Sequence, residues 1–421
     1  MTSKALWVML ILLSPLVGFS FIQAVSLYAE ASRSAQEFPD LATGMVPLDG
    51  ILVPTFGGFY IAMTLLFPFV AIRVIGMEKY TGAIKLLLQT PFGIPKIIAI
   101  KLMALLVCWF LTLVPGLSAV VIWQAFGGHL YWPDLLNLLL GQMLYSLVIA
   151  GIAFFAASIT DNYGTAAIVA LSFTIGSWVL DFSLGHKLLF WSGLGSLSLT
   201  AALKGFEQGL FALSRALQLL VLSLGFVTLS AVWFHPGRSV YTKTINSMMV
   251  LSLAAISFVM AGDARMFKDT TEDRRHSFSP AVEKTLQRID QDFRITVHLA
   301  PDDPRLVDLD RSLISKLQRL MPRVSVVIVE PKRGGLFGAG SDDAYGQVFY
   351  EYAGRQEQSR STSPKEVLPL IFGLARLPIP EDKDWTFAGH PLVDDAYLSG
   401  VWFYCVLPLL FASALWFTHR R

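Results

Sequence analysis

The chain has 421 residues, of which 54% are hydrophobic and only 15% are charged, whereas soluble domains contain about 25% charged residues. This composition excludes a disordered chain, a disulfide scaffold and an ordinary cytosolic enzyme. The charges are unevenly distributed, because Asp263 to Tyr397 contains 19 of the 33 Lys/Arg and 22 of the 31 Asp/Glu. The sequence therefore combines a long apolar part with a segment charged like a soluble domain.

Eight apolar stretches approach the length of about 20 residues that is needed to cross a bilayer. They are Leu6–Tyr28, Ile51–Val74, Ile97–Phe126, Leu135–Ile159, Thr165–Leu184, Ala216–Phe234, Met248–Gly262, which is the shortest, and Leu398–Thr418. Glycines and two charges interrupt residues 188–213, so we expect a re-entrant outer hairpin there. The predicted fold is a polytopic α-helical membrane protein of about eight spans, with a small α/β extracytoplasmic domain between the last two.

The orientation of the spans follows from the distribution of Lys and Arg, which favour cytoplasmic loops. With both termini inside, ten basic residues lie in the inner segments and four in the short outer loops. The inner ones are Lys4, Arg73, Lys79, Lys85, Lys96, Lys101, Arg238, Lys243, Arg420 and Arg421, and the outer ones are Arg33, Lys187, Lys204 and Arg215. Residues 1–31 also have features of a cleaved signal peptide, although their apolar run of about 23 residues exceeds the usual 7–15.

The charged segment reads as alternating helices and strands. Ser279-Pro280 is typical of a helix start, and the run Val324–Val329 is rich in β-branched residues. We therefore expect a β-α-β unit flanked by further elements. The expected order is a helix to about Ile289, a strand at Phe293–Leu299, a helix at Arg305–Leu320, strands at Val324–Val329 and Gln347–Tyr352, and a helix at Pro364–Leu374.

The longest inner loop, Arg73 to Lys101, contains the most informative pattern. Its apolar and basic residues predict an amphipathic inner helix over residues 75–96, which ends before Pro91 because proline disfavours helix in the residue before it. One interpretation is a generic basic interfacial helix. The other is a coupling helix that docks on a cytoplasmic partner, with the candidate coupling residues Glu78, Lys79, Gly82, Lys85, Thr90 and Pro91.

This loop resembles the ABC-2 type permeases, the membrane subunits of ABC exporters, in its order E-x-x-x-G-x-x-x-L-L-x-T-P followed by a Lys at a span start. Ala156–Asn162 is similar to a small-residue turn between spans four and five of that family, and Leu197–Ala216 to its outer hairpin. The resemblance covers roughly residues 50–235. It implies a bacterial inner-membrane location, a separate cytoplasmic ABC ATPase dimer, and pairing with a second copy or a related permease.

The remainder resembles another protein family. Asp273–Leu286, Ile295–Leu299 and Val329-Glu330-Pro331 are similar to the extracytoplasmic domain of the gliding-motility-type ABC auxiliary proteins, and Gly389-His390-Pro391 to part of its G-H-G motif. The chain thus resembles a fusion of a permease and a shortened auxiliary domain, which implies a periplasmic or envelope partner. The expected division is 1–240 for the permease domain, 241–262 for the seventh span, 263–397 for the periplasmic domain and 398–421 for the last span and tail.

Several other functions are disfavoured. The glycine-rich segment 334–341 lacks the lysine of a P-loop, so ATP hydrolysis is assigned to a partner chain. The spans contain few ionisable residues, which disfavours a proton- or ion-coupled carrier. Asp181, Phe206 and Glu207 are the candidates for a substrate path or gate. No Lys/Arg run with interleaved aromatics indicates nucleic acid.

An enzyme would have to use the remaining acids and histidine, namely Asp302-Asp303, Asp342-Asp343, His390 and Asp394-Asp395. Acids in turns before helices are more often structural, so we expect no catalytic residues, metal ligands or cofactor. Three functions therefore remain, in order of preference. They are an ABC exporter permease, a mechanotransmission or scaffold subunit that transports nothing through its spans, and a membrane-anchored enzyme.

Overall fold

The computed structural model describes residues 4–83, 86, 89, 92–184, 198–235, 237–300, 303–321, 323–329, 344–380 and 387–419, with the side chains of 180–184 and 419 excepted. The chain forms two compact units. The first comprises Met1–Thr270 with Ala388–Arg421, and the second is Thr271–Phe387. The second unit therefore begins later and ends earlier in the sequence than the predicted domain, residues 263–397.

The first unit is helical. Its long helices are α1 (Lys4–Glu37), α2 (Val53–Leu65), α3 (Phe67–Tyr80), α5 (Ile94–Thr112), α6 (Val114–Ala125), α7 (Trp132–Ile159), α8 (Tyr163–Leu184), α11 (Leu213–Trp233), α12 (Val240–Gly262) and α18 (Leu407–His419). A short break at residues 65–68 separates α2 from α3, and another at residues 112–115 separates α5 from α6. In each break a proline occupies one of the first positions of the following helix, where its missing N–H is tolerated.

Seven helical stretches among the described residues are long and apolar enough to cross a membrane. They are Lys4–Glu37, Leu48–Tyr80, Ile94–Ala125, Trp132–Ile159, Leu213–Trp233, Val240–Gly262 and Ser399–Thr418. The predicted fifth span coincides with α8, whose apolar part Tyr163–Val179 is shorter. The chain is thus a polytopic helical membrane protein, and the predicted seventh span is longer than expected because its helix begins at Val240.

Helix α7 is the central element of this unit, and small residues allow its neighbours to approach closely. A Cβ atom on Gly151 would lie 3.0 Å from the carbonyl oxygen of Ser223 on α11. The Ser223 and Ser230 hydroxyls donate to α7 carbonyls over 3.0 and 3.2 Å. Small residues and cross-helix hydroxyl bonds are the usual means by which helices associate in lipid, where apolar burial between helices supplies little driving force.

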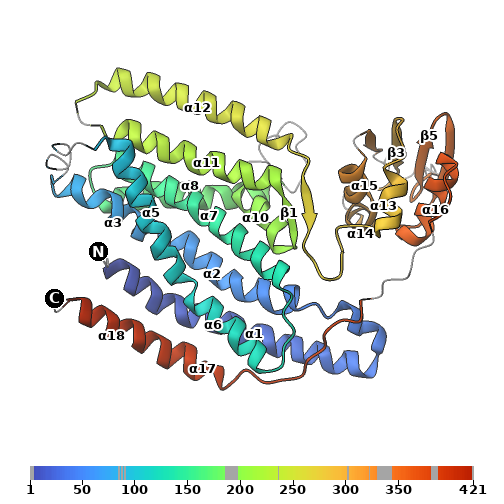
Figure 1. Ribbon diagram of the computed structural model, residues 1–421, viewed down its shortest axis with the longest axis horizontal. Helices are drawn as coiled ribbons and strands as arrows, with labels where there is room; N and C mark the ends of the chain where they lie inside the picture. The colour runs from blue at the N-terminus through green and yellow to red at the C-terminus, as the bar shows by residue number, and fades with distance from the viewer. Residues whose placement is uncertain are drawn as a thin grey trace, which may run out of the picture. The chain divides into compact units, whose positions relative to one another are not determined.

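Both termini lie at the end of the first unit where α3 is followed by α5 (Figure 1). The opposite end contains a short helix, α10 (Leu199–Glu207), and a two-stranded antiparallel sheet of β1 (Leu210–Ala212) and β2 (Phe267–Asp269). Only part of the predicted hairpin 188–213 is described, and within it α10 packs against α7. The β1–β2 pair was not predicted, because three-residue strands leave no periodic pattern.

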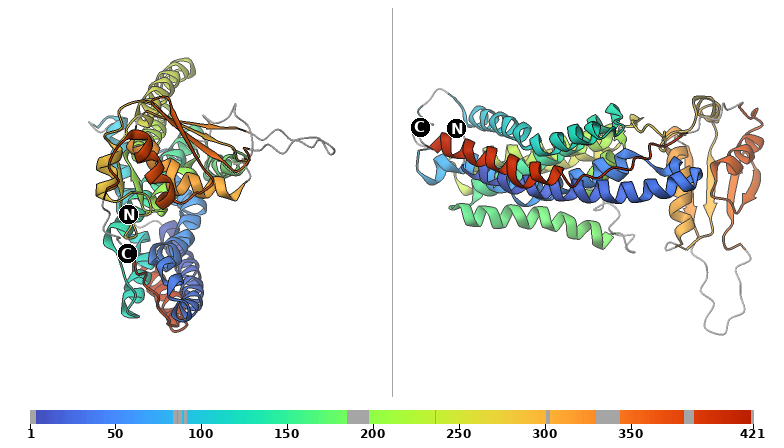
Figure 2. Two further views of the ribbon diagram at one scale, coloured as in Figure 1. Left: turned by 90° about the vertical axis from the view of Figure 1, so that its right-hand side faces the viewer. Right: turned by 90° about the horizontal axis from the view of Figure 1, so that it is seen from below.

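The second unit contains a four-stranded sheet of order β4-β3-β5-β6 and helices that pack on it (Figure 2). Its strands are β3 (Phe293–Val297), β4 (Val324–Ile328), β5 (Val348–Tyr352) and β6 (Arg355–Ser359), and its helices are α13 (Pro280–Leu286), α14 (Pro304–Leu309), α15 (Ser315–Leu320) and α16 (Pro364–Ala375). β3 and β4 pair in parallel, and the other neighbours are antiparallel. Side chains of β3 and β5 alternate between buried positions and half-buried or exposed ones, so one face of the sheet meets the helices.

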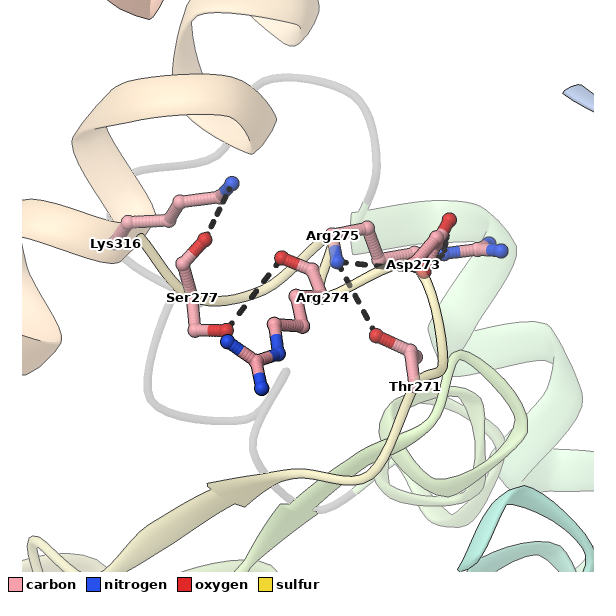
Figure 3. Close-up of polar contacts among 6 residues, drawn as sticks. All are labelled: Thr271, Asp273, Arg274, Arg275, Ser277 and Lys316. Carbon is pink, nitrogen blue, oxygen red and sulfur yellow. Dashed lines mark hydrogen bonds and ion pairs between the residues drawn. The ribbon is translucent and has the colours of Figure 1, made fainter. Parts of the chain in front are cut away.

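A polar network holds the first residues of the second unit (Figure 3). The Arg275 side chain pairs with Asp273 over 2.9 Å, and the Lys316 ammonium donates to the Ser277 carbonyl over 3.2 Å. At the start of α14, hydrogen bonds from Arg305 to Asp303 lower the pKa of that carboxyl well below its usual range. Asp303 thus caps a helix, which is the structural alternative that the sequence offered.

Candidate functional site: the junction of α3, α5, α7 and α8

Lys79, near the end of α3, binds the end of a different helix. Its ammonium donates to the carbonyl oxygens of Ala157, Ser158 and Thr160 over 3.2, 2.8 and 2.5 Å. The last carbonyls of a helix have no partner within the helix and carry the negative end of its dipole. A single ammonium, with three donors, therefore caps the end of α7.

Glu78 joins α3 to α5. Its carboxylate lies 2.5 Å from the ammonium of Lys101, and both side chains are largely shielded from solvent. The same ammonium donates to the Val74 carbonyl over 2.6 Å. The two neighbouring residues Glu78 and Lys79 thus connect α3 to two other helices, and neither is a solvated charge of an amphipathic surface.

Tyr80 completes the junction. Its hydroxyl lies 3.3 Å from the Ala157 carbonyl and 3.2 Å from the Thr160 hydroxyl. Its ring contacts that of Tyr163, the first residue of α8, edge to face at 4.5 Å. We call Glu78, Lys79, Tyr80 and Lys101, together with residues 157–160, the α3–α7 junction. It brings together two stretches, 73–101 and 156–162, that the sequence singled out separately.

The helix expected over residues 75–96 is interrupted. α3 ends at Tyr80, and Gly82 follows with φ of +76°, a conformation that closes helix ends and favours glycine. The Gly82 N–H donates to the Lys79 carbonyl over 3.2 Å. Beyond this turn Leu86 is 67% exposed, and Phe92 and Lys96 are also exposed. Lys85, Thr90 and Pro91 lie outside the described residues.

The candidates for a substrate path lie at the opposite end. The Phe206 carbonyl accepts a hydrogen bond of 2.9 Å from Asn137 on α7, and the Phe206 ring occupies the space that a Cβ on Gly141 would need. Glu207 ends α10, where burial raises the pKa of its carboxyl. Asp181 belongs to α8, but its side chain is outside the described part. Phe206 and Glu207 therefore share one packed end of α7.

Two buried polar residues of α7 were not singled out from the sequence. Asp134 is 3% exposed in the first turn of the helix, where an acid favours the dipole. Gln142 is fully buried, and among the described residues its side-chain amide has no hydrogen-bond partner. Asp134 could have been found from the sequence, because Trp132-Pro133-Asp134 is a typical helix start. Nothing in the sequence distinguishes Gln142.

Two spaces in the first unit bear on what the spans could carry. The smaller, of about 10 Å³, lies between Phe67, Trp109 and Ser146. The larger, of about 560 Å³, is a groove beside α1, lined mostly by apolar side chains such as Phe19, Leu27 and Val46. Neither space is lined by several charged groups.

The segment that follows the second unit returns to the first unit. The His390 N–H donates to the Met45 carbonyl over 2.9 Å, and the His390 carbonyl accepts from the Tyr28 hydroxyl over 2.8 Å. The His390 ring stacks on His129 with centroids 3.7 Å apart. Asp394 and Asp395 accept hydrogen bonds from nearby backbone N–H groups, whereas Asp302, Asp342, Asp343 and the glycine-rich segment 334–341 lie outside the described residues.

Comparison with known proteins gives no further guide. No protein-family model matches the chain, and neither the curated proteins nor the solved structures include a match. The site therefore has to be interpreted from its own residues.

Proposed function

We propose that the chain is the membrane permease subunit of an ABC transporter, an exporter, driven by a separate cytoplasmic ATPase dimer. The observation that supports this proposal is the α3–α7 junction. Two stretches that each resemble the ABC-2 permeases, residues 73–101 and 156–162, are about 80 residues apart in the sequence yet share hydrogen bonds. Because the two stretches contact each other, we assign them a common role, which is to link the end of α3 to the neighbouring helices.

The geometry revises the role of each coupling residue. Glu78 and Lys79 are engaged with α5 and α7, so we assign them to transmission within the membrane part. The residues beyond Gly82, with Leu86 and Phe92 exposed, are the contact for the ATPase. Closure of the ATPase would displace this turn, and the junction would pass the displacement to α5 and α7 together.

Under this proposal the cargo is apolar or lipid-linked. Apart from the α3–α7 junction, the described part of the spans contains no buried cluster of charges, and the groove beside α1 is lined mainly by hydrocarbon. The same observation favours the second candidate function, in which ATP moves an envelope partner and nothing passes through the spans. In both, the first unit has both termini in the cytoplasm, and residues 263–397 lie outside it.

The test begins with purification of the chain from its native membrane. We expect a protein with a P-loop to co-purify, and we expect its ATPase activity in lipid nanodiscs to depend on this chain. Gly82→Pro, which removes the N–H that donates to Lys79, should abolish the dependence. Gly82→Asn should retain it, because asparagine tolerates positive φ.

Two outcomes would contradict the proposal, namely the absence of any co-purifying ATPase, and equal ATPase stimulation by both Gly82 variants. Transport of fluorescent lipid analogues in vesicles separates the two candidate functions. ATP-dependent movement of an analogue supports the exporter, whereas coupled ATPase activity without movement of any analogue supports mechanotransmission.

A further inference from the structure

A polar groove of about 770 Å³ lies in the second unit, at the end of the sheet where β3 and β4 begin and β5 turns into β6. Three arginines line it, Arg294, Arg323 and Arg355, together with the acids Asp292 and Glu351. This volume is in the range of small-molecule sites, but its lining is more polar than is usual for them.

The arginines are not neutralised by the acids beside them. Within the described residues no ion pair involves Arg294, Arg355, Asp292 or Glu351. Arg323 donates to the backbone carbonyl of Asp290, which leaves its charge uncompensated. A guanidinium carries five N–H donors in a fork that matches the two oxygens of a carboxylate or phosphate. The groove therefore offers donors without partners, with an excess of positive charge.

The sheet fixes the spacing of these groups. Arg294 is paired in register with Ser325 on β4 and with Glu351 on β5, and Arg355 begins β6, two strands from β3. Because neighbouring strands are about 4.8 Å apart, the backbones that carry Arg294 and Arg355 are separated by roughly 10 Å. Arg355 pairs with Tyr352, which pairs with the buried Phe293, so Arg355 and Arg294 belong to opposite faces of the sheet. An extended molecule that passes the end of the sheet can reach both arginines, whereas one compact anion suits only one of them.

The walls of the groove are rigid. β5 and β6 are joined by Ala353 and Gly354, which both have positive φ, at 50° and 75°, as the tightest hairpin turn requires. Phe293 and Tyr350, which are fully buried, anchor β3 and β5 from the helical side. A rigid site loses less conformational entropy on binding than a mobile one.

We propose that this groove binds an extended polar molecule that carries two or more oxyanions, either carboxylates or phosphates. Arginine is the side chain best suited to both groups, and the two inter-strand steps from β3 through β5 to β6 set the spacing of Arg294 and Arg355. Glu351, on the strand between them, repels a bound anion. It therefore lowers the affinity of the groove for the ligand and disfavours ligands with a continuous run of negative charge. The inference concerns the second unit alone and does not depend on the permease function.

The test uses the full chain in uncharged detergent, with short-chain polyphosphate and short poly-glutamate as probes in calorimetric titrations. We expect at least one of them to bind, and the combined change Arg294→Gln and Arg355→Gln to weaken binding at least about tenfold, which corresponds to about 1.4 kcal/mol. Arg311→Gln, an exposed arginine outside the groove, is the matched control and should leave binding unchanged. Glu351→Gln should strengthen binding, an effect that damage to the fold would not produce.

The probe that binds more tightly identifies the source of the oxyanions. Failure of both probes to bind the unaltered protein would overturn the proposal. So would equal affinity of the double variant and the unaltered protein, or an equally large loss with Arg311→Gln.

Discussion

At the scale of single residues, the main result is that two adjacent charges, which the sequence predicts to couple the chain to a partner, join α3 to two other helices. The pattern of the loop from Arg73 to Lys101 singled out Glu78 and Lys79. It did not indicate their contacts, since Lys79 binds backbone carbonyls about 80 residues away. Backbone groups at a helix end leave no trace in the side-chain pattern, so their partners cannot be inferred from it.

The cap by Lys79 leads to a stability prediction. Lys79→Met keeps the aliphatic stem but leaves three carbonyls without this donor, so we expect a loss of about 1–3 kcal/mol. The thermal midpoint in detergent should fall accordingly. Lys96→Met is the control, because the residue is exposed and, within the described part of the chain, its ammonium contacts only the Phe92 ring. An equal midpoint for the two variants would refute the cap.

A second residue-scale prediction concerns Gly389. A Cβ atom there would overlap the Ala42 carbonyl oxygen, and the φ of Gly389 is +73°. Gly389→Ala should cost at least about 1–3 kcal/mol from the backbone conformation alone, and it should free the segment around His390 from Met45. Hydrogen exchange should then increase at residues 388–392. Gly57→Ala, which meets nothing within 4 Å, should leave this exchange unchanged.

At the scale of elements, the long helices were the most predictable part of the molecule. Each apolar stretch of the sequence coincides with a helix because lipid requires every backbone group to be bonded within its segment. The failures occur at short elements. The strands β1 and β2 and the capping of α7 depend on contacts between distant segments, which residue spacing does not encode. The turn at Gly82 is a local helix end, closed by its hydrogen bond to the Lys79 carbonyl.

The second unit offers a direct test of which elements form its core. Ile371, on α16, is fully buried against the sheet, whereas Ile328 on the edge strand β4 is 48% exposed. Ile371→Ala should destabilise the unit by about 2–5 kcal/mol, and Ile328→Ala by much less. Hydrogen exchange of β3 and β5 in the full chain measures the difference. Similar increases in exchange for both variants would contradict this core.

At the scale of the whole molecule, the candidate site was predictable only in part. The ten inner against four outer basic residues predict an orientation, which stays a prediction. The structure adds that both termini and the α3–α7 junction lie at the same end of the first unit (Figure 1). The grouping of Glu78, Lys101 and Thr160 into one junction needed the folded chain. The arginine groove was not predicted at all, because its members are spread over three strands.

The orientation gives the fourth prediction. In intact spheroplasts, added protease should cleave within 271–387, and in inverted vesicles it should not. A tag placed after Arg421 should show the reverse accessibility. Cleavage of the second unit from the cytoplasmic side would overturn both the orientation and the assignment of Leu86 and Phe92 to an ATPase contact.

The insertion between Thr270 and Ala388 is fastened to the helical unit at two separate places. Its leading end is held through β2 and the hydrogen bond from Thr270 to Gly209, beside α10, whereas its trailing end is held through Met45, beside α1. The two chain ends that flank the inserted unit are therefore joined to different parts of the helical unit, and a displacement of α10 relative to α1 would change the distance between them.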